Sequence, residues 1–179
     1  QLSLGYQRQL DARTLISLDL MLAETSNLAR LRDLNAPSSY GITAEQAANL
    51  SPSDLAALVR SREQADATRP VAPIAGGARG IIVSETEGAS HYKALNLSLY
   101  RDSGQRGLGY RLSYTLSQLR NNTDDINFRA RDANDFDDEW GLSINDRTHV
   151  INLLGSWTAV SGLRISAAAL LQSGQPLNL

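Results

Sequence analysis

Acidic side chains gather in one short stretch of the sequence, residues 132–141 (DANDFDDEWG). The charged members and the tryptophan that follows them are Asp132, Asp135, Asp137, Asp138, Glu139 and Trp140. Because calcium takes several carboxylate oxygens, one hypothesis is an outer loop that binds calcium or a solute. The EF-hand pattern fails, since its fifth position is Phe136. The alternative is a solvated loop whose Trp140 packs at the rim of the fold, as charge runs are usually solvated. Asp135, Asp137, Asp138, Glu139 and Trp140 are the candidates for contact with a solute or another loop, and no metal site is predicted.

The histidines, glycines and serines of the chain do not lie in the patterns that metal binding, phosphate binding or nucleophilic catalysis requires. His91 and His149 each begin an expected strand, and neither has an acidic neighbour at metal-ligand spacing. The glycine-rich stretch 76–80 lacks the lysine of a phosphate-binding loop, and no serine lies in a G-x-S-x-G motif. We therefore expect no enzyme and no cofactor. With 17 basic and 19 acidic residues, the chain also lacks the basic surface that nucleic acid requires.

The elements that would position these residues are strands. In residues 107–120 (GLGYRLSYTLSQLR), apolar and polar side chains alternate. The apolar set is Leu108, Tyr110, Leu112, Tyr114 and Leu116, and the set between them is Gly109, Arg111, Ser113, Thr115 and Ser117. A strand sends successive side chains to opposite faces. The pattern therefore predicts a strand with one apolar face, which must meet either a protein core or lipid.

The alternation recurs along the chain and predicts an all-β, antiparallel meander of long strands. Hairpins are expected at about residues 1–23, 90–119 and 148–173, with long outer loops at about 24–89 and 120–147. In the first loop, Thr43 and Gln46 fit a capping box, and Ser51 followed by Pro52 fits a helix start. Segment 81–88 is either a further strand or the upper part of the strand that begins near Ser90.

Strand length and loop asymmetry favour a membrane barrel over a soluble sheet. The strands are long enough to cross a bilayer at a tilt, and the connections are short at one end and long at the other, as in outer-membrane barrels. The polar faces suit a wet lumen, toward which Asp19, Arg111 and Arg164 are expected to point. The alternative is a soluble secreted or surface β-sandwich that serves as a binding module, because soluble antiparallel sheets also alternate.

Four pieces of the chain form a recognisable series: IIVSETEGASHYKALNLSLYRD, GYRLSYTLSQLRNNTDD, DDEWGLSINDRTHVINLLGSW and GLRISAAALLQSGQPLN. They resemble the barrel of TonB-dependent outer-membrane receptors, in particular the subgroup with an N-terminal carboxypeptidase-regulatory-like domain. The order and spacing of the pieces also match, over roughly residues 69–179, and residues 6–37 fit an earlier hairpin of the same barrels.

The resemblance implies a receptor for active uptake of a scarce solute, in the outer membrane of a Gram-negative type of cell. In such receptors a plug fills a barrel of the 22-stranded kind, and the inner-membrane TonB complex pulls on the plug. The expected partners are outer-membrane lipid, the TonB complex acting through a plug, and an unidentified small solute. The chain shows no plug, signal peptide or aromatic barrel end. We therefore expect residues 1–179 to be a single partial barrel segment of a longer protein.

Overall fold

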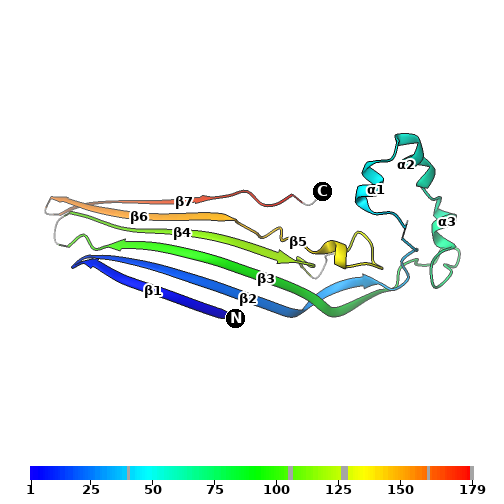
Figure 1. Cartoon of the computed structure of the whole chain (residues 1–179), viewed down its shortest axis with the longest axis horizontal. Helices are drawn as coiled ribbons and strands as arrows, with labels where there is room; N and C mark the ends of the chain where they lie inside the picture. The colour runs from blue at the N-terminus through cyan, green and yellow to red at the C-terminus, as the bar shows by residue number, and fades with distance from the viewer. Residues whose placement is uncertain (40, 105–106, 126–128, 161, 178–179) are drawn as a thin grey trace.

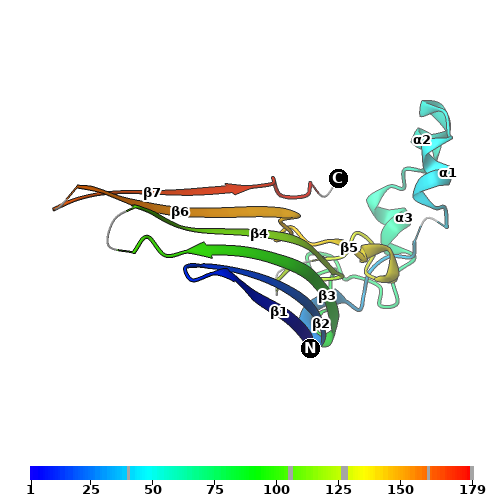
Figure 2. The ribbon, with the colours of Figure 1, turned by 60° about the vertical axis from the view of Figure 1, so that its left-hand side comes forward.

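Seven antiparallel strands form one sheet in the computed structural model, which describes residues 1–39, 41–104, 107–125, 129–160 and 162–177. The strands are β1 (Leu2–Asp11), β2 (Thr14–Asp33), β3 (Ile82–Arg101), β4 (Gly107–Asn121), β5 (Gly141–Leu142), β6 (His149–Val160) and β7 (Leu163–Gln172). Their order is β1-β2-β3-β4-β6-β7, and β5 pairs with β4. Figures 1 and 2 show the β1–β2 turn at one end of the sheet and the connection that carries α-helices at the other. The predicted antiparallel meander of long strands is confirmed.

The register gives the sheet two chemically different faces. On one face, Leu18 pairs with Leu97, and Leu97 pairs with Tyr114. One residue along each strand, on the other face, Ser17, Ser98, Ser113 and Asn152 form a polar row. The apolar side chains of β4 predicted from the alternation therefore share a face with the leucines of β2, β3 and β6.

Among the described residues, no element packs over the middle of the apolar face. Leu18 and Leu97 are each 41% exposed, and the buried apolar side chains among the described residues are Ala36, Ala94 and Phe136. A soluble sandwich needs a second sheet to cover its leucines, whereas the described strands all belong to one sheet. The described strands therefore do not form the two-sheet sandwich of the alternative interpretation.

Two of the predicted strand ends differ from the structure. β2 continues to Asp33 instead of ending near Ala23, and β3 begins at Ile82 instead of Ser90, so that segment 81–88 is mostly the upper part of β3. Register shifts between Thr25 and Arg30, and a positive φ of 61° at Asn27, interrupt the alternation there. Because bulges break the two-residue period, the sequence pattern stops before the strand does.

The upper parts of β2 and β3 form an arm to which the 120–147 connection is attached. The Nε of Arg30 donates to Glu85 at 2.6 Å, and the Arg30 guanidinium lies 3.7 Å from the centre of the Phe136 ring. Arg30 is 7% exposed and Glu85 is half-buried, so the ion pair is partly buried and is covered by an aromatic ring. Through Phe136, the arm therefore fixes the position of the acidic loop, residues 132–141.

The 34–81 connection contains three short helices, α1 (Ala44–Ala48), α2 (Pro52–Leu58) and α3 (Arg62–Asp66). The capping box of Thr43 and Gln46 and the helix start at Ser51 are confirmed. α3 begins with a further capping box at Ser61, which was not predicted from the sequence. No helix in the described part of the chain is long and apolar enough to cross a membrane. The hairpins expected at about 90–119 and 148–173 include residues 105, 106 and 161, which lie outside the described residues.

A polar network closes the base of this connection. The side-chain amide of Asn35, which is 3% exposed, donates to the carbonyls of Val71 and Arg79, and its Oδ1 accepts from the Val71 N–H at 2.7 Å. Asp66 receives Arg79 Nε at 2.7 Å and Arg69 Nε at 2.9 Å. Buried polar groups are stable only when they are hydrogen-bonded, so these bonds fix the two ends of a long loop together.

Candidate functional site

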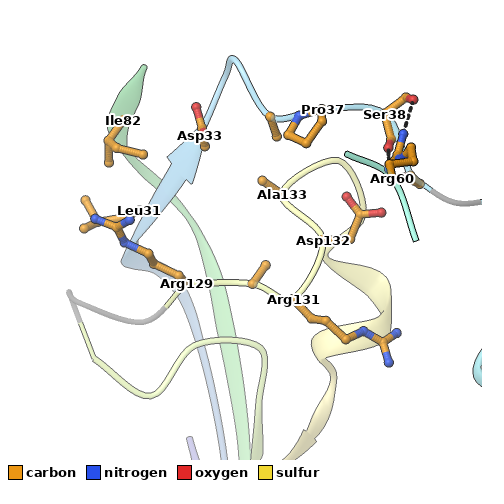
Figure 3. Close-up of a pocket in the computed structure, with 13 residues that line it drawn as sticks. Leu31, Asp33, Pro37, Ser38, Arg60, Ile82, Arg129, Arg131, Asp132 and Ala133 are labelled. Atoms are coloured by element: carbon orange, nitrogen blue, oxygen red, sulfur yellow. Dashed lines mark hydrogen bonds between the residues drawn. The ribbon is translucent and has the colours of Figure 1, made fainter. Parts of the chain in front are cut away.

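A cleft of about 280 Å³ lies at the long-loop end of the sheet, where three segments meet (Figure 3). The ends of β2 and β3 supply Leu31, Asp33 and Ile82, the 34–81 connection supplies residues 36–39 and Arg60, and the 120–147 connection supplies residues 129–133. Leu31 forms a parallel bridge with Arg129, and the Asn134 side chain donates to the Pro37 carbonyl at 2.9 Å. These two links bring the acidic loop against the helical connection.

Charged side chains of both signs line the cleft. Arg60 donates to the hydroxyl and the carbonyl of Ser38, and Arg131 points away from the cleft and pairs with Asp138 at 2.9 Å. Asp33 accepts hydrogen bonds from the N–H groups of Asn35 and Ile81, and it therefore stabilises the base of the 34–81 connection. Arg129 is exposed and forms no ion pair with any residue that the structure describes. Charges of both signs on loops that are linked to each other and to the sheet suit the binding of a polar solute.

Asp132 is the acidic residue of the 132–141 stretch that reaches the cleft (Figure 3). Partial burial acts to raise the pKa of the Asp132 carboxyl, but hydrogen bonds from Ser39 and from Asn134 outweigh burial and lower it below the ordinary value. Its Oδ1 accepts the Asn134 N–H at 2.9 Å. Asp132 is therefore ionised at neutral pH, as a fixed acceptor at the edge of the cleft.

The other acidic residues predicted to contact a solute or another loop form hydrogen bonds within their own loop instead. Asp135 accepts the N–H of Asp137 at 2.9 Å, Glu139 accepts the N–H of Arg131 at 2.6 Å, and Asp138 pairs with the Arg131 guanidinium. Asp137 lies in a single 3-10 turn, Asp137–Glu139, and is exposed. Within the described ranges, no three acidic or histidine side chains converge on a point where a metal ion would fit. The carboxylates are neighbours in sequence without forming one site.

Trp140 leaves the acidic loop and packs on the sheet. Its ring lies edge-on to His91, with the ring centres 4.8 Å apart. His91 shares a face with Lys93 and Leu95 of β3, because side chains two apart on a strand point the same way. Trp140 therefore lies at the edge of the apolar face and outside the cleft.

The polar face carries the three side chains predicted to point into a lumen. Asp19 pairs in register with Gly5 and Asn96, and a Cβ on Gly5 would approach Asp19 Oδ1 to 2.6 Å, so glycine leaves room for the carboxylate. Arg111 and Arg164 line one hollow of about 590 Å³ toward the short-turn end. Arg111 lies 5.7 Å from the Tyr100 ring centre, and Arg164 Nε lies 3.5 Å from Thr158 Oγ1. The structure brings the two arginines together and places Asp19 in a separate row.

The sequence pattern did not predict two groups of residues that shape these regions. Arg129 and Asn134 build the cleft, but their partners lie in residues 31–39, and the Asn134–Pro37 bond spans 97 residues. Ser143 and Asp146, both buried, close the edge of β4: Asp146 Oδ1 accepts the Leu119 N–H at 2.6 Å, and the Ser143 N–H donates to the Leu119 carbonyl. No local pattern indicates the cleft, because it depends on contacts between distant segments.

Comparison with known protein families places the chain in a described family. A family model described as an outer membrane beta barrel domain matches residues 1–179. No curated protein and no solved structure matches the chain.

Proposed function

The chain belongs to the outer membrane beta barrel domain family, and from that premise we propose that it is part of the barrel of a TonB-dependent receptor for active uptake of a scarce solute. The sheet is a partial outer-membrane barrel, with its apolar face toward lipid and its polar face toward the lumen. The short turns lie on the periplasmic side, and the long connections form the outer surface. Receptor function is the proposal, and it goes further than the family does.

The observation that carries the proposal is the cleft at the outer surface. It is built by the ends of β2 and β3 and by two loops, and the base of the 34–81 loop is fixed by the hydrogen bonds of the buried Asn35 side chain. A solute-binding site gains affinity when its loops are held before the solute arrives. Arg129 and Asp132 place one charge of each sign in it, which suits a polar solute with charged groups. We propose binding and transport, with no enzymatic step and no bound cofactor.

Plug contact and a TonB partner belong to the same proposal. Arg111 and Arg164 form no ion pair with the described residues, and they line one hollow on the polar face. β1 and β7 each have one sheet neighbour, and an unpaired strand edge in lipid is costly. We propose that further strands complete a wide barrel and that Arg111 and Arg164 face a plug inside it, which the TonB complex acts on.

Uptake by cells tests the proposal. The gene for the full-length protein is deleted in its host, and uptake of labelled metal chelates, vitamins and sugars is compared with and without the gene, each in the presence and absence of TonB. The proposal expects at least one compound whose uptake needs both the gene and TonB. Uptake that needs the gene but continues unchanged without TonB would contradict the receptor assignment and indicate a passive channel.

Variants of the cleft separate binding from barrel assembly. Arg129→Ala with Asp132→Asn is expected to raise the half-saturating concentration of that compound by about tenfold or more, because charged hydrogen bonds are worth about 1.5–3 kcal/mol. Asp137→Asn is the control, since Asp137 is an exposed acidic residue outside the cleft. Equal effects in the two variants would remove the cleft from the proposal.

A further inference from the structure

A second hollow lies on the lipid-facing side of the sheet, where the apolar band ends. The leucine row Leu20–Leu95–Leu116 is followed, toward the outer surface, by Leu22–Lys93–Gln118 and then by Glu24–His91–Arg120. All these side chains share the face of the leucines, because each row is two residues along the strand from the last. The lipid-facing side therefore changes within two rows from leucines to mainly polar and charged side chains, among them Lys93, His91 and Arg120.

Beside these basic side chains, Trp140 forms one wall of a hollow of about 290 Å³. The residues that line it include Leu22, Glu24, His91, Lys93, Arg120 and Trp140. The Trp140 ring packs on His91 at 4.8 Å, and Arg120 Nη2 lies 3.5 Å from the Trp140 carbonyl oxygen. Tryptophan is enriched at the level of lipid headgroups, so its position agrees with the change of polarity beside it.

The cations of this hollow are exposed and form no ion pair with any described residue. The ion pairs of the structure lie elsewhere, on Arg30, Arg32, Arg69, Arg79, Arg101 and Arg131. Lys93 and Arg120 are exposed, and Glu24 is the acidic residue that lines the hollow with them. Lys93 pairs in register with Gln118, two residues before Arg120, which places the two cations about 7–8 Å apart at the backbone. Both side chains are long enough to reach one anion between them.

We propose that Lys93 and Arg120 bind a phosphate group on a glycolipid of the outer leaflet of the outer membrane. The two cations outnumber the single carboxylate, and arginine with lysine is a favourable pair for phosphate oxygens. The leucine rows below the hollow take the acyl chains of the same lipid, and Trp140 covers the sugar-level part of the headgroup. The assignment rests on the outer-membrane location and is independent of the receptor proposal.

Lipid binding by the full-length protein in nanodiscs tests the assignment. The probes are a phosphorylated glycolipid of the lipid A type and the same lipid with its phosphates removed, and the bound lipid is measured by native mass spectrometry. Wild-type protein is expected to bind the phosphorylated lipid about tenfold or more tightly than the dephosphorylated one, since charge-assisted bonds to the phosphate are lost. Equal binding of the two lipids would overturn the assignment, and this comparison needs no variant protein.

A pair of variants assigns the effect to this hollow. Lys93→Ala with Arg120→Ala is expected to remove most of the preference for the phosphorylated lipid. Arg8→Ala is the control, because Arg8 pairs in register with Ile16 and is thus a cation on the same face toward the short-turn end. An unchanged preference in the double variant would overturn the assignment. Displacement of the lipid by millimolar inorganic phosphate alone would likewise overturn it, since the hollow would then be a simple anion site.

Discussion

Leu112 and Ser113 are adjacent in β4 and face opposite environments. Leu112 pairs with Leu99 and Leu153 on the lipid-facing side, whereas Ser113 pairs with Ser98 and Asn152 toward the lumen. We predict that Leu112→Arg costs about 2–4 kcal/mol of unfolding free energy, because arginine near the bilayer midplane is expensive. Ser113→Arg is expected to cost much less. Denaturant unfolding of the full-length protein in phospholipid vesicles measures both, and equal costs would argue against the assigned faces.

Asp66 makes the order of the helical connection depend on pH. The hydrogen bond from Arg79, followed by that from Arg69, lowers the pKa of Asp66 below the ordinary 3.8. A carboxyl whose pKa is lowered by folding adds stability that is fully present above the unfolded pKa and is lost as the pH falls through the folded pKa. We therefore predict that amide protection in residues 62–81, corrected for intrinsic exchange, is constant at neutral pH and falls below about pH 4.

The matched variants are Asp66→Asn and Glu45→Gln. Asp66→Asn is expected to weaken protection at neutral pH and to remove the acid-dependent loss, because the titrating partner of Arg69 and Arg79 is gone. Glu45 is an exposed acid in the first turn of α1, and Glu45→Gln should leave the profile as in the wild type. Identical profiles in all three proteins would show that the ion pairs do not hold the connection.

At the level of single residues, the faces of β4 could be predicted from the sequence, but the roles of the acidic cluster could not. Alternation is local, so Leu112 and Ser113 follow from the strand period alone. Asp132 and Asp135 differ only in what other segments bring to them: Asp132 meets Ser39 and the cleft, while Asp135 closes its own turn. Such long-range packing leaves no trace in the spacing of the carboxylates.

Among the elements, the arm of β2 and β3 depends on a close approach at Gly88. A Cβ there would lie 2.6 Å from Thr123 Cγ2 and 2.8 Å from the Leu28 carbonyl oxygen. We predict that Gly88→Ala destabilises the arm by about 1–3 kcal/mol, as other insertions of a methyl group into a packed site do. Faster proteolysis in the loops on either side is the expected readout.

Gly155→Ala is the control for that experiment. Gly155 lies in β6, and a Cβ there would meet nothing within 4 Å. The variant should therefore match the wild type in loop proteolysis and in denaturant unfolding. Similar losses in both variants would mean that glycine flexibility, and not the contact with Thr123, determines the stability of the arm.

Element boundaries show where local patterns stop being informative. Alternation predicts the hairpins, and local sequence predicts the caps at Thr43 and Ser51, and the structure contains both features. Alternation does not predict the upper halves of β2 and β3, because bulges shift the register between Thr25 and Arg30. The Arg30–Glu85 pair and the loop packed on it stabilise these upper halves, and such tertiary contacts are not visible in a local pattern.

For the whole molecule, a single sheet with an uncovered apolar face is stable only where an apolar medium such as lipid contacts that face. Leucines at 36–43% exposure form continuous rows across the middle of β2, β3, β4 and β6. From Leu108 to Leu116 the band measures about 27 Å along the strand, comparable with the apolar band of about 25 Å of outer-membrane barrels. The central claim is therefore that this face contacts lipid while the opposite face contacts water.

Spin labels along β4 test that claim most directly. The chain has no cysteine. Single cysteines at positions 108–117 can therefore each carry a label in the full-length protein in lipid vesicles, once any cysteine outside residues 1–179 has been replaced. We predict that collision with oxygen, which dissolves in lipid, is high at 108, 110, 112, 114 and 116 and low between them. Collision with a water-soluble nickel chelate should show the opposite phase. Loss of the two-residue period, or its reversal, would contradict the assignment of the leucine face to lipid and the serine face to the lumen.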